Sequence, residues 1–407
     1  MGRARRARGE IDLSDAAVID NHVHGFRIED LLAHDPLDFE TRLNLLGTLF
    51  SDSTLTSQAA AADPRLWQQV RGFTDSTVFS LAVRRMLAER LGCEATPEAV
   101  AATRDKALRD DPVAYIRSLL EDARVEGLLV DDGFPLPRVP AQEFRHTVGG
   151  TPVHRVARIE TMILDIREQA RDLASLEEAF DAELDRAAAD ATTVAYKSII
   201  AYRTGLDVAP VGRDEAGAAY ERWRADGWKE SREHAKPVRD HLLVRAAEAA
   251  KRHDRVLHIH TGDGDPDIVL SRARPHDLAP FLKERLGQPI VLIHTGFPWT
   301  SVAAYLASSL PHVYLDLSVL IPWASLAIDR HLVELLGIAP AGKLLYSSDE
   351  ASEPEVIWIA ARLGRRALER ALGDAVDRDF LTPAEAESLG RAILSTNSRR
   401  LHGLQAS

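Results

Sequence analysis

Short apolar runs rich in β-branched residues alternate with helical segments along most of the chain, and this alternation limits the possible folds more than any other feature. The predicted strands lie within 18–25, 127–130, 154–161, 192–201, 255–260, 289–294, 313–316 and 343–349. The helices predicted after the third strand are 173–189, 213–250, 277–286, 302–309 and 326–336. Eight strands that alternate with helices favour a parallel α/β architecture, the (β/α)8 barrel of TIM type.

The alternative is an open, doubly wound parallel sheet. Such sheets often carry a Gly-x-Gly-x-x-Gly turn after the first strand, and none is present here. The glycine-rich stretch 262–265 is acidic, and therefore a poor phosphate cradle. We therefore predict that residues 1–407 form a single barrel domain.

A long segment without a strand, 26–122, separates the first two predicted strands. Helix-start signals recur in it, as at Thr96-Pro97-Glu98 and Asp111-Pro112. We interpret the segment as a helical insertion. Because it leaves the first strand at its carboxyl end, we expect it to cover the active-site mouth of the barrel.

Composition and charge exclude several classes of protein. The formal net charge of −12 argues against general nucleic-acid binding, and no apolar run is long enough to cross a membrane. Cys93 is the single cysteine, which rules out an intrachain disulfide and a cysteine-rich zinc site. The arginines at positions 3, 5, 6 and 8 precede no apolar stretch, so we predict a frayed terminus and not a signal peptide. We expect a cytoplasmic homo-oligomer that acts on a small molecule.

Polar residues able to bind metal follow the apolar runs at the predicted strand ends. His22 and His24 lie two apart on one strand, so both imidazoles project from the same face. The other residues in equivalent places are Lys197, His260, His294 and Asp349. Since barrel enzymes build their sites at the carboxyl ends of the strands, these side chains predict a metal centre.

This order of residues resembles the amidohydrolase superfamily, which shares the (β/α)8 barrel. The closest likeness is to the amidohydrolase-related family, and 195–206, 258–265, 314–318 and 344–349 resemble the amidohydrolase part of glutamine-synthetase-like fusion proteins. The resemblance implies that His22, His24 and Asp349 hold one divalent ion, most often Zn²⁺, with Mn²⁺ or Fe²⁺ as alternatives. His260 and His294 would hold a second ion or complete the shell of the first.

The resemblance also implies roles for Lys197 and Asp349. In binuclear relatives the lysine carries a carboxyl group on its amine and bridges two metals; an unmodified ammonium at Lys197 would instead pair with a substrate carboxylate. Asp349 would act as the general base that takes a proton from water and passes it to the leaving group.

Four further side chains have two interpretations each. Arg203 suits bidentate capture of a substrate carboxylate, or a structural ion pair. Tyr202 and Trp299 would form walls of the pocket, or pack in the core. His258 lies one pleat deeper than His260, and we interpret it as a packing or supporting residue, with a metal ligand as the alternative.

Hydrolysis of a C–N bond in a small carboxylate-bearing amide is the function that this pattern favours, with γ-glutamyl amides as one candidate class from the resemblance. One alternative is a metal-dependent decarboxylase of the same family. Another is a non-catalytic barrel that serves as a binding module.

Overall fold

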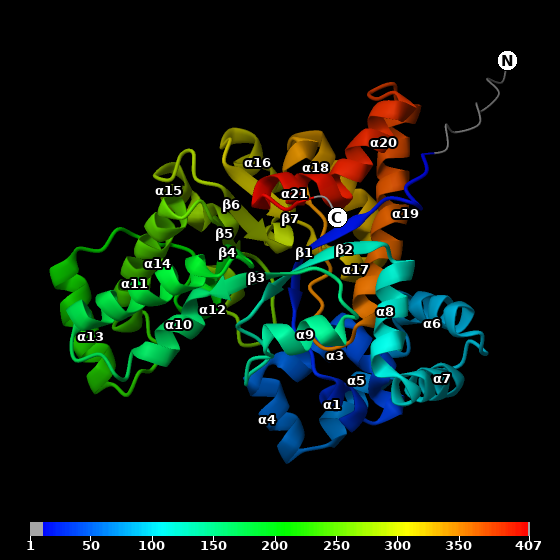
Figure 1. Ribbon diagram of the computed structural model, residues 1–407, viewed down its shortest axis with the longest axis horizontal. Coiled ribbons are helices and arrows are strands. Elements are labelled where there is room, and N and C mark those ends of the chain that lie inside the picture. Colours follow the sequence, from blue (N-terminus) through cyan, green and yellow to red (C-terminus); the bar gives the residue numbers. More distant parts are fainter. Residues whose placement is uncertain (1–10, 406–407) are drawn as a thin grey trace.

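Parallel strands form the centre of the molecule in the computed structural model, which describes residues 11–405 (Figure 1). The sheet has eight strands, whose order follows the sequence: β1 (Val18–His24), β2 (Val125–Asp131), β3 (Val153–Arg158), β4 (Thr193–Ser198), β5 (Val256–His260), β6 (Ile290–Ile293), β7 (Val313–Asp316) and β9 (Leu344–Leu345). Every neighbouring pair is parallel. The two-residue β8 (Ser318–Val319) lies outside this sheet.

The ring of strands closes almost completely between β9 and β1. The Asn21 N–H donates to the Tyr346 carbonyl at 3.1 Å, and the Asp349 N–H donates to the His22 carbonyl at 3.0 Å. The predicted (β/α)8 barrel is therefore confirmed. The four arginines at positions 3–8 lie outside the described residues.

Alternation along the strands divides the core in two. The barrel interior is filled by a small apolar cluster from alternate strand positions: Ile19, Leu129, Val156, Ala195, Val256, Val291, Ile293 and Leu345. A much larger cluster joins the outer strand faces to the helices. The carboxyl ends of the strands carry polar side chains in the inward positions, which places the candidate site there.

Helices surround the barrel on the outside. They are α9 (Ala141–Thr147), α10 (Ile159–Ile166), α11 (Leu173–Ala189), α12 (Ile200–Arg203), α13 (Arg213–Ala225), α14 (Ala235–Arg252), α15 (Ala279–Lys283), α16 (Thr300–Ser309), α17 (Leu320–Trp323), α18 (Ile328–Ile338), α19 (Glu355–Asp377), α20 (Pro383–Arg391) and α21 (Asn397–His402). No helix within residues 11–405 is long and apolar enough to cross a bilayer.

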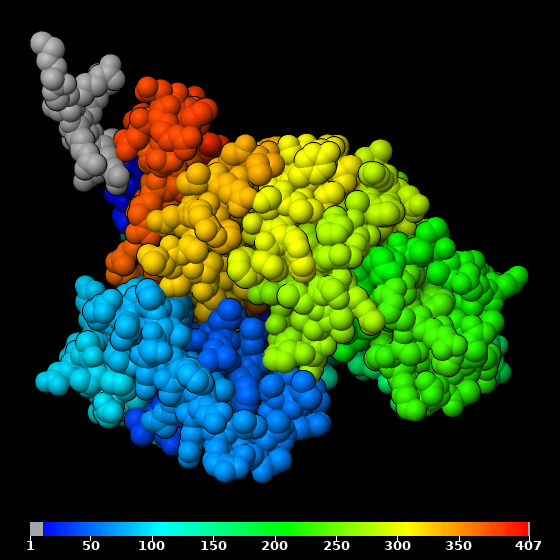
Figure 2. All heavy atoms as spheres, turned by 180° about the vertical axis from the view of Figure 1, so that it is seen from behind, coloured from blue at the N-terminus to red at the C-terminus, as the bar shows by residue number. Residues whose placement is uncertain are grey.

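Eight further helices lie between β1 and β2 and gather on one side of the molecule, coloured blue to cyan in Figures 1 and 2. They are α1 (Ile28–Ala33), α2 (Phe39–Leu43), α3 (Leu45–Asp52), α4 (Thr54–Ala62), α5 (Arg65–Thr74), α6 (Val78–Leu91), α7 (Pro97–Asp110) and α8 (Pro112–Asp122). The Thr96 and Asp111 side chains cap α7 and α8 by accepting from the N–H groups of Ala99 and Ala114.

Several predicted boundaries differ from the structure. The strand predicted at 192–201 ends at Ser198, because the Glu160 carboxylate accepts from the Ser198 hydroxyl and from the Ile199 N–H and turns the chain into α12. The strand predicted at 154–161 ends at Arg158, where α10 begins. The helix predicted at 213–250 is two helices separated by residues 226–234.

The last strand also differs from its prediction. It has regular pairing only at Leu344–Leu345, whereas 343–349 was expected. Beyond it the backbone bonds irregular partners: the Tyr346 N–H donates to the Ile393 carbonyl, and the Ser348 N–H to the Asp20 carboxylate. The chain remains extended enough to carry Asp349 to the mouth of the barrel.

Candidate metal centre and substrate cavity

An irregularity in the register of β1 lets His22 and His24 both face the same cavity. The pairing of β1 with β2 shifts between Asp20 and Val23, as a β-bulge does, and a bulge changes which side chains face inward. Ile19 therefore packs inside the barrel while Val23 packs outside it. His22 and His24 both face the cavity, with ring centroids 4.9 Å apart.

His22, His24 and Asp349 bring their ligand atoms together. Among residues 11–405 they are the one group of three or more His, Cys, Asp or Glu whose ligand atoms all lie within 4.8 Å of one another. The Asp349 Oδ1 atom lies 3.2 Å from His22 Nε2 and 3.8 Å from His24 Nε2. Its other oxygen, Oδ2, lies 3.8 Å from His294 Nδ1, so one carboxylate stands between two histidine groups.

Lys197 lies on the interior face of β4 and is almost completely buried. Its Nζ atom is 3.0 Å from His22 Nε2 and 3.6 Å from Asp131 Oδ2. Asp131, at the end of β2, also accepts from Arg158, with Nε–Oδ1 and Nη2–Oδ2 distances of 2.9 and 2.5 Å. Asp131 and Arg158 were not predicted as site residues, although each is the last residue of a barrel strand, as His260 is.

His260 and His294 form a second pair. His260 Nε2 donates to the Asp263 carbonyl at 2.8 Å, which leaves its Nδ1 lone pair directed at His294 Nε2, 3.1 Å away. His294 Nδ1 is hydrogen-bonded to the Ser318 hydroxyl at 2.8 Å. The pair adjoins Asp349, and the metal-binding role predicted for it stays a prediction.

His258 is buried and has a partner far from the cavity. Its Nε2 atom lies 2.9 Å from Nε2 of His402 on α21, and it does not line the cavity. The side chain therefore packs in the barrel interior and joins the last helix to the core.

Burial keeps the candidate metal-site histidines in the neutral form, which is the form that binds cations. Burial lowers the pKa of His24 to about 3 and lowers the pKa of His22, His260 and His294 well below the usual value, with nearby Lys197 contributing. Burial raises the pKa of Asp349 and lowers that of Lys197. Arg158 and then Lys197 outweigh burial at Asp131 and hold its pKa below the usual range.

The donor set fits a divalent cation. Two neutral imidazoles and a carboxylate are ordinary zinc ligands, and the Nε2 atoms of His22 and His24 both face the Asp349 Oδ1 atom, at 3.2 and 3.8 Å. A carboxylate buried beside neutral histidines is costly without a compensating positive charge. A bound cation would supply that charge to all three side chains.

A cavity of about 410 Å³ opens above these residues. The predicted Tyr202 and Arg203 line it, as do the α3 residues Leu45, Leu49 and Asp52 of the insertion. The Arg203 side chain makes no hydrogen bond or ion pair with any described residue, and burial lowers its pKa. Trp299 is not brought to the cavity: it precedes α16, and Trp323 of α17 lines the cavity instead.

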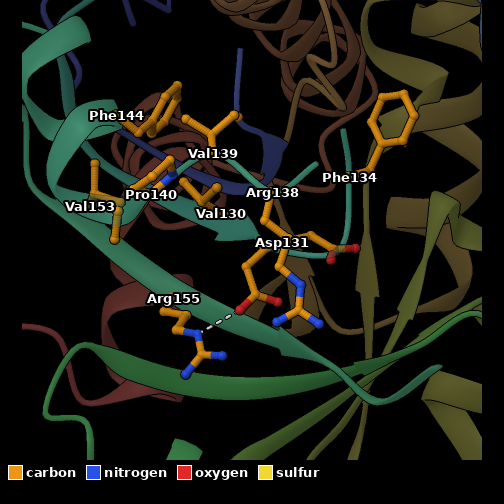
Figure 3. A pocket seen from close by; sticks show the side chains of 12 residues that line it. Val130, Asp131, Phe134, Arg138, Val139, Pro140, Phe144, Val153 and Arg155 are labelled. Carbon is orange, nitrogen blue, oxygen red and sulfur yellow. Dashed lines mark hydrogen bonds and ion pairs between the residues drawn. The ribbon is translucent and has the colours of Figure 1, made fainter. Parts of the chain in front are cut away.

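A smaller cavity of about 250 Å³ lies beneath the loop that follows β2 (Figure 3). Figure 3 shows Val130, Val139, Pro140, Phe144 and Val153 at one end of it and Phe134 at the other. Arg155, in its wall, donates to the Asp132 carboxylate at 2.6 Å. Phe134 lines both cavities and contacts the His24 ring edge to face, with centroids 5.5 Å apart.

Comparison with known proteins identifies the family. The amidohydrolase family model matches residues 165–404, more than half of the chain. Protein FluG of Emericella nidulans is 32% identical over 335 residues, which cover 75% of this chain. The chain belongs to the amidohydrolase family. The match covers 38% of FluG, consistent with the resemblance to an amidohydrolase part of larger fusion proteins.

Solved structures agree with this assignment. A structure described as a metal-dependent hydrolase from Lactobacillus casei is 25% identical, with a TM-score of 0.73 over 96% of this chain and 97% of that one. Glucuronate isomerase from Caulobacter crescentus, 18% identical, has a TM-score of 0.67 over 97% and 92% of the two chains. The isomerase shows the same fold, so the reaction of this amidohydrolase must be argued from its own site.

Proposed function

We propose that this amidohydrolase hydrolyses a C–N amide bond in a small substrate that carries a carboxylate. The observation that carries the proposal is the convergence of His22, His24 and Asp349 at the floor of a cavity whose wall holds an unpaired arginine, Arg203. The first group fits a cation, and the second fits an anionic substrate. γ-Glutamyl amides belong to this class.

Each of these residues has a separate role in the proposed hydrolysis. A bound divalent ion, with Zn²⁺ the first choice, supplies Lewis acidity and makes water more acidic. Asp349 accepts a proton from the attacking water and returns it to the nitrogen as the C–N bond breaks, which yields a carboxylic acid and an amine. Arg203 binds the substrate carboxylate, and Tyr202 limits the cavity beside it.

The chemical state of the Lys197 amine determines whether the site holds one metal ion or two. With a carboxylated amine, Lys197 would join His260 and His294 in holding a second ion. The Asp131 carboxylate 3.6 Å away offers the unmodified ammonium a partner, which supports a single ion. That arrangement also suits the alternative function, decarboxylation of a small acid at one metal, in which the Lys197 ammonium pairs with the substrate.

Metal removal tests the proposal. Purified protein stripped with a chelator should lose its activity toward γ-glutamyl amides, and Zn²⁺ or Mn²⁺ should restore it. His24→Ala should retain less metal by elemental analysis and show no activity, while His146→Ala, an exposed histidine on α9, should behave as wild type. Release of carbon dioxide from aromatic acids, with no amine released from amides, would instead support the decarboxylase.

A further inference from the structure

The catalytic cavity is lined differently on its two sides. Polar side chains predominate at and beyond the ends of β3, β4 and β5, which are consecutive in the barrel. They are Arg158, Tyr202, Arg203, Asp263, Asp265 and Asp267, with the apolar Ile199 among them. The apolar side chains Phe134, Leu136, Val319 and Trp323 follow β2 and β7. Since β9 and β1 stand between β7 and β2 in the ring, the polar and apolar groups occupy different arcs of the mouth.

The insertion extends the apolar arc. It leaves the barrel after β1, within that arc, and the face of α3 with Leu45 and Leu49 adds apolar surface to the cavity wall. The same helix also brings the polar Thr48 and Asp52 to the cavity, and the Ser53 hydroxyl at its end donates to Asp267 beyond β5. The indole N–H of Trp323 donates to the Leu43 carbonyl at 3.0 Å and fixes the start of α3 against the barrel. Leu45 and Leu49 are four residues apart, so they lie on the same face of the helix.

The apolar arc also adjoins the second cavity. Phe134 lines both spaces, and beyond it lie Val130, Val139 and Phe144 (Figure 3). Charged side chains, Asp131, Arg138 and Arg155, also line this second cavity, so its apolar surface is the part formed by Phe134 and by the Val130, Val139 and Phe144 group. The smaller cavity alone exceeds the roughly 150 Å³ that holds benzene in an engineered apolar site.

We infer that the substrate is an amide that joins a carboxylate-bearing group, held on the Arg203 side, to an apolar alkyl or aryl group, held by Leu45, Leu49, Phe134 and Trp323. This inference rests on the proposed amide hydrolysis and specifies its substrate. The scissile bond then lies between the two arcs, over His22, His24 and Asp349. The apolar group belongs either to the acid or to the amine, and both arrangements place it in the same arc.

Leu49 and Leu45 are therefore specificity-determining residues that the insertion supplies. Their side chains are partly exposed in the cavity, and an apolar substrate group would cover them. One methylene in a hydrophobic pocket changes discrimination by about 10–200-fold. Leu46, on the same helix, is exposed and does not line the cavity, so it provides a matched control.

Ligand binding tests the inference independently of turnover. Zinc-loaded protein is titrated calorimetrically with acetate and with hexanoate, which share a carboxylate and differ in the apolar tail. Hexanoate should bind at least about tenfold more tightly than acetate. Leu49→Ser should reduce this ratio at least about fivefold, and Leu46→Ser should leave it unchanged. Equal binding of the two acids, or equal ratios in the two variants, would overturn the inference.

Turnover then identifies which side of the amide is apolar. The probes are two matched pairs: glutaric acid monoamide with its N-butyl derivative, and N-acetylglycine with N-hexanoylglycine. We expect the apolar member of one pair to have a kcat/KM at least about tenfold higher, through KM. Equal rates within both pairs would overturn the inference while supporting amide hydrolysis. Failure to cleave any probe, together with selective binding of hexanoate, would refute the proposed reaction and leave the apolar arc supported.

Discussion

Asp349 is held in position by its backbone as well as by its neighbours. Its φ of +55° is in the left-handed region, which aspartate and asparagine adopt more readily than most residues. Its N–H donates to the His22 carbonyl, so the last strand and β1 fix each other where both carry candidate ligands. The carboxylate therefore lies between His22 and His294 without support from a regular strand.

The substitution Asp349→Asn should lower activity and leave the fold intact. Asparagine tolerates the same backbone conformation, so circular dichroism and the melting temperature should stay near those of wild type. Loss of the proton acceptor should lower kcat by about 10²–10⁴-fold, and elemental analysis should show weaker metal retention. Retention of full activity would exclude Asp349 as the general base.

The amine of Lys197 has two testable states. Protein equilibrated with ¹³C-bicarbonate should give a carbamate signal in the ¹³C NMR spectrum if Lys197 is carboxylated, and Lys197→Ala should remove that signal. We expect the signal together with two ions per chain, or neither. A single ion with no signal would favour an ammonium paired with Asp131.

The candidate ligands could be predicted from sequence because each follows an apolar run at a strand end. The same signal was present at Asp131 and Arg158, but the second strand was predicted to end just before Asp131, and the third was predicted to run past Arg158. Trp323 could not be predicted as a lining residue, because its place depends on contacts with α3 far away in the sequence. Trp299 was a poor choice for the same reason.

At the scale of elements, buried charges fasten the insertion to the loop after β9. The guanidinium of Arg104 on α7 contacts Glu353 at 2.5 Å and Glu355 at 2.9 Å, and all three side chains are nearly inaccessible to solvent. Arg42 on α2 also pairs with Glu353, and the Tyr115 hydroxyl donates to Glu355 at 2.8 Å. Asp349 lies in the same connection between β9 and α19, so the insertion supports a part of the candidate site.

Arg104→Leu should be strongly destabilising. Removing one partner leaves the Glu353 and Glu355 carboxylates buried with less compensation, which typically costs about 3–5 kcal/mol. Urea unfolding should show this loss. Arg109→Leu, which breaks an exposed pair with Asp105 on the same helix, should cost less than about 1 kcal/mol. Similar losses in the two variants would contradict the role of the buried network.

Elements with local signals were predicted best. The helix at 173–189 and the strand at 313–316 have the predicted boundaries; the helix begins at a capping box formed by Asp172 and Ser175. The last strand was predicted too long because its later residues bond to the C-terminal segment and to β1, partners that no local pattern reveals. Tertiary contacts therefore determined the boundaries that differed.

At the scale of the whole molecule, buried neutral histidines link stability to pH. Burial lowers the pKa of His402 to about 4, and lowers the pKa of its partner His258 well below the usual value. The unfolded chain, with histidine pKa values near 6.5, binds more protons than the folded chain between those limits. Stability from these groups is therefore present above about pH 6.5 and is lost as the pH falls toward 4.

His402→Gln should reduce this pH dependence. From pH 7 to pH 5 the histidine contributes a loss of about 1–2 kcal/mol to the free energy of unfolding. Because glutamine does not titrate, the free energy of unfolding of the variant, measured by urea titration, should fall by about 1–2 kcal/mol less than that of wild type between pH 7 and pH 5. His146→Gln, at an exposed position, should retain the wild-type slope. An unchanged slope in His402→Gln would show that His402 is not held neutral by burial.

The insertion begins directly after β1, and this position affects how the substrate range of such an enzyme could change in evolution. The candidate ligands belong to the barrel, whereas part of the cavity wall belongs to α3, so recombination within residues 26–122 would alter the substrate range without touching the ligands. The buried network limits which exchanges survive, since an incoming segment must bring cations for Glu353 and Glu355. Natural lineages that lose Arg104 are therefore expected to lose an acidic partner at 353 or 355 as well.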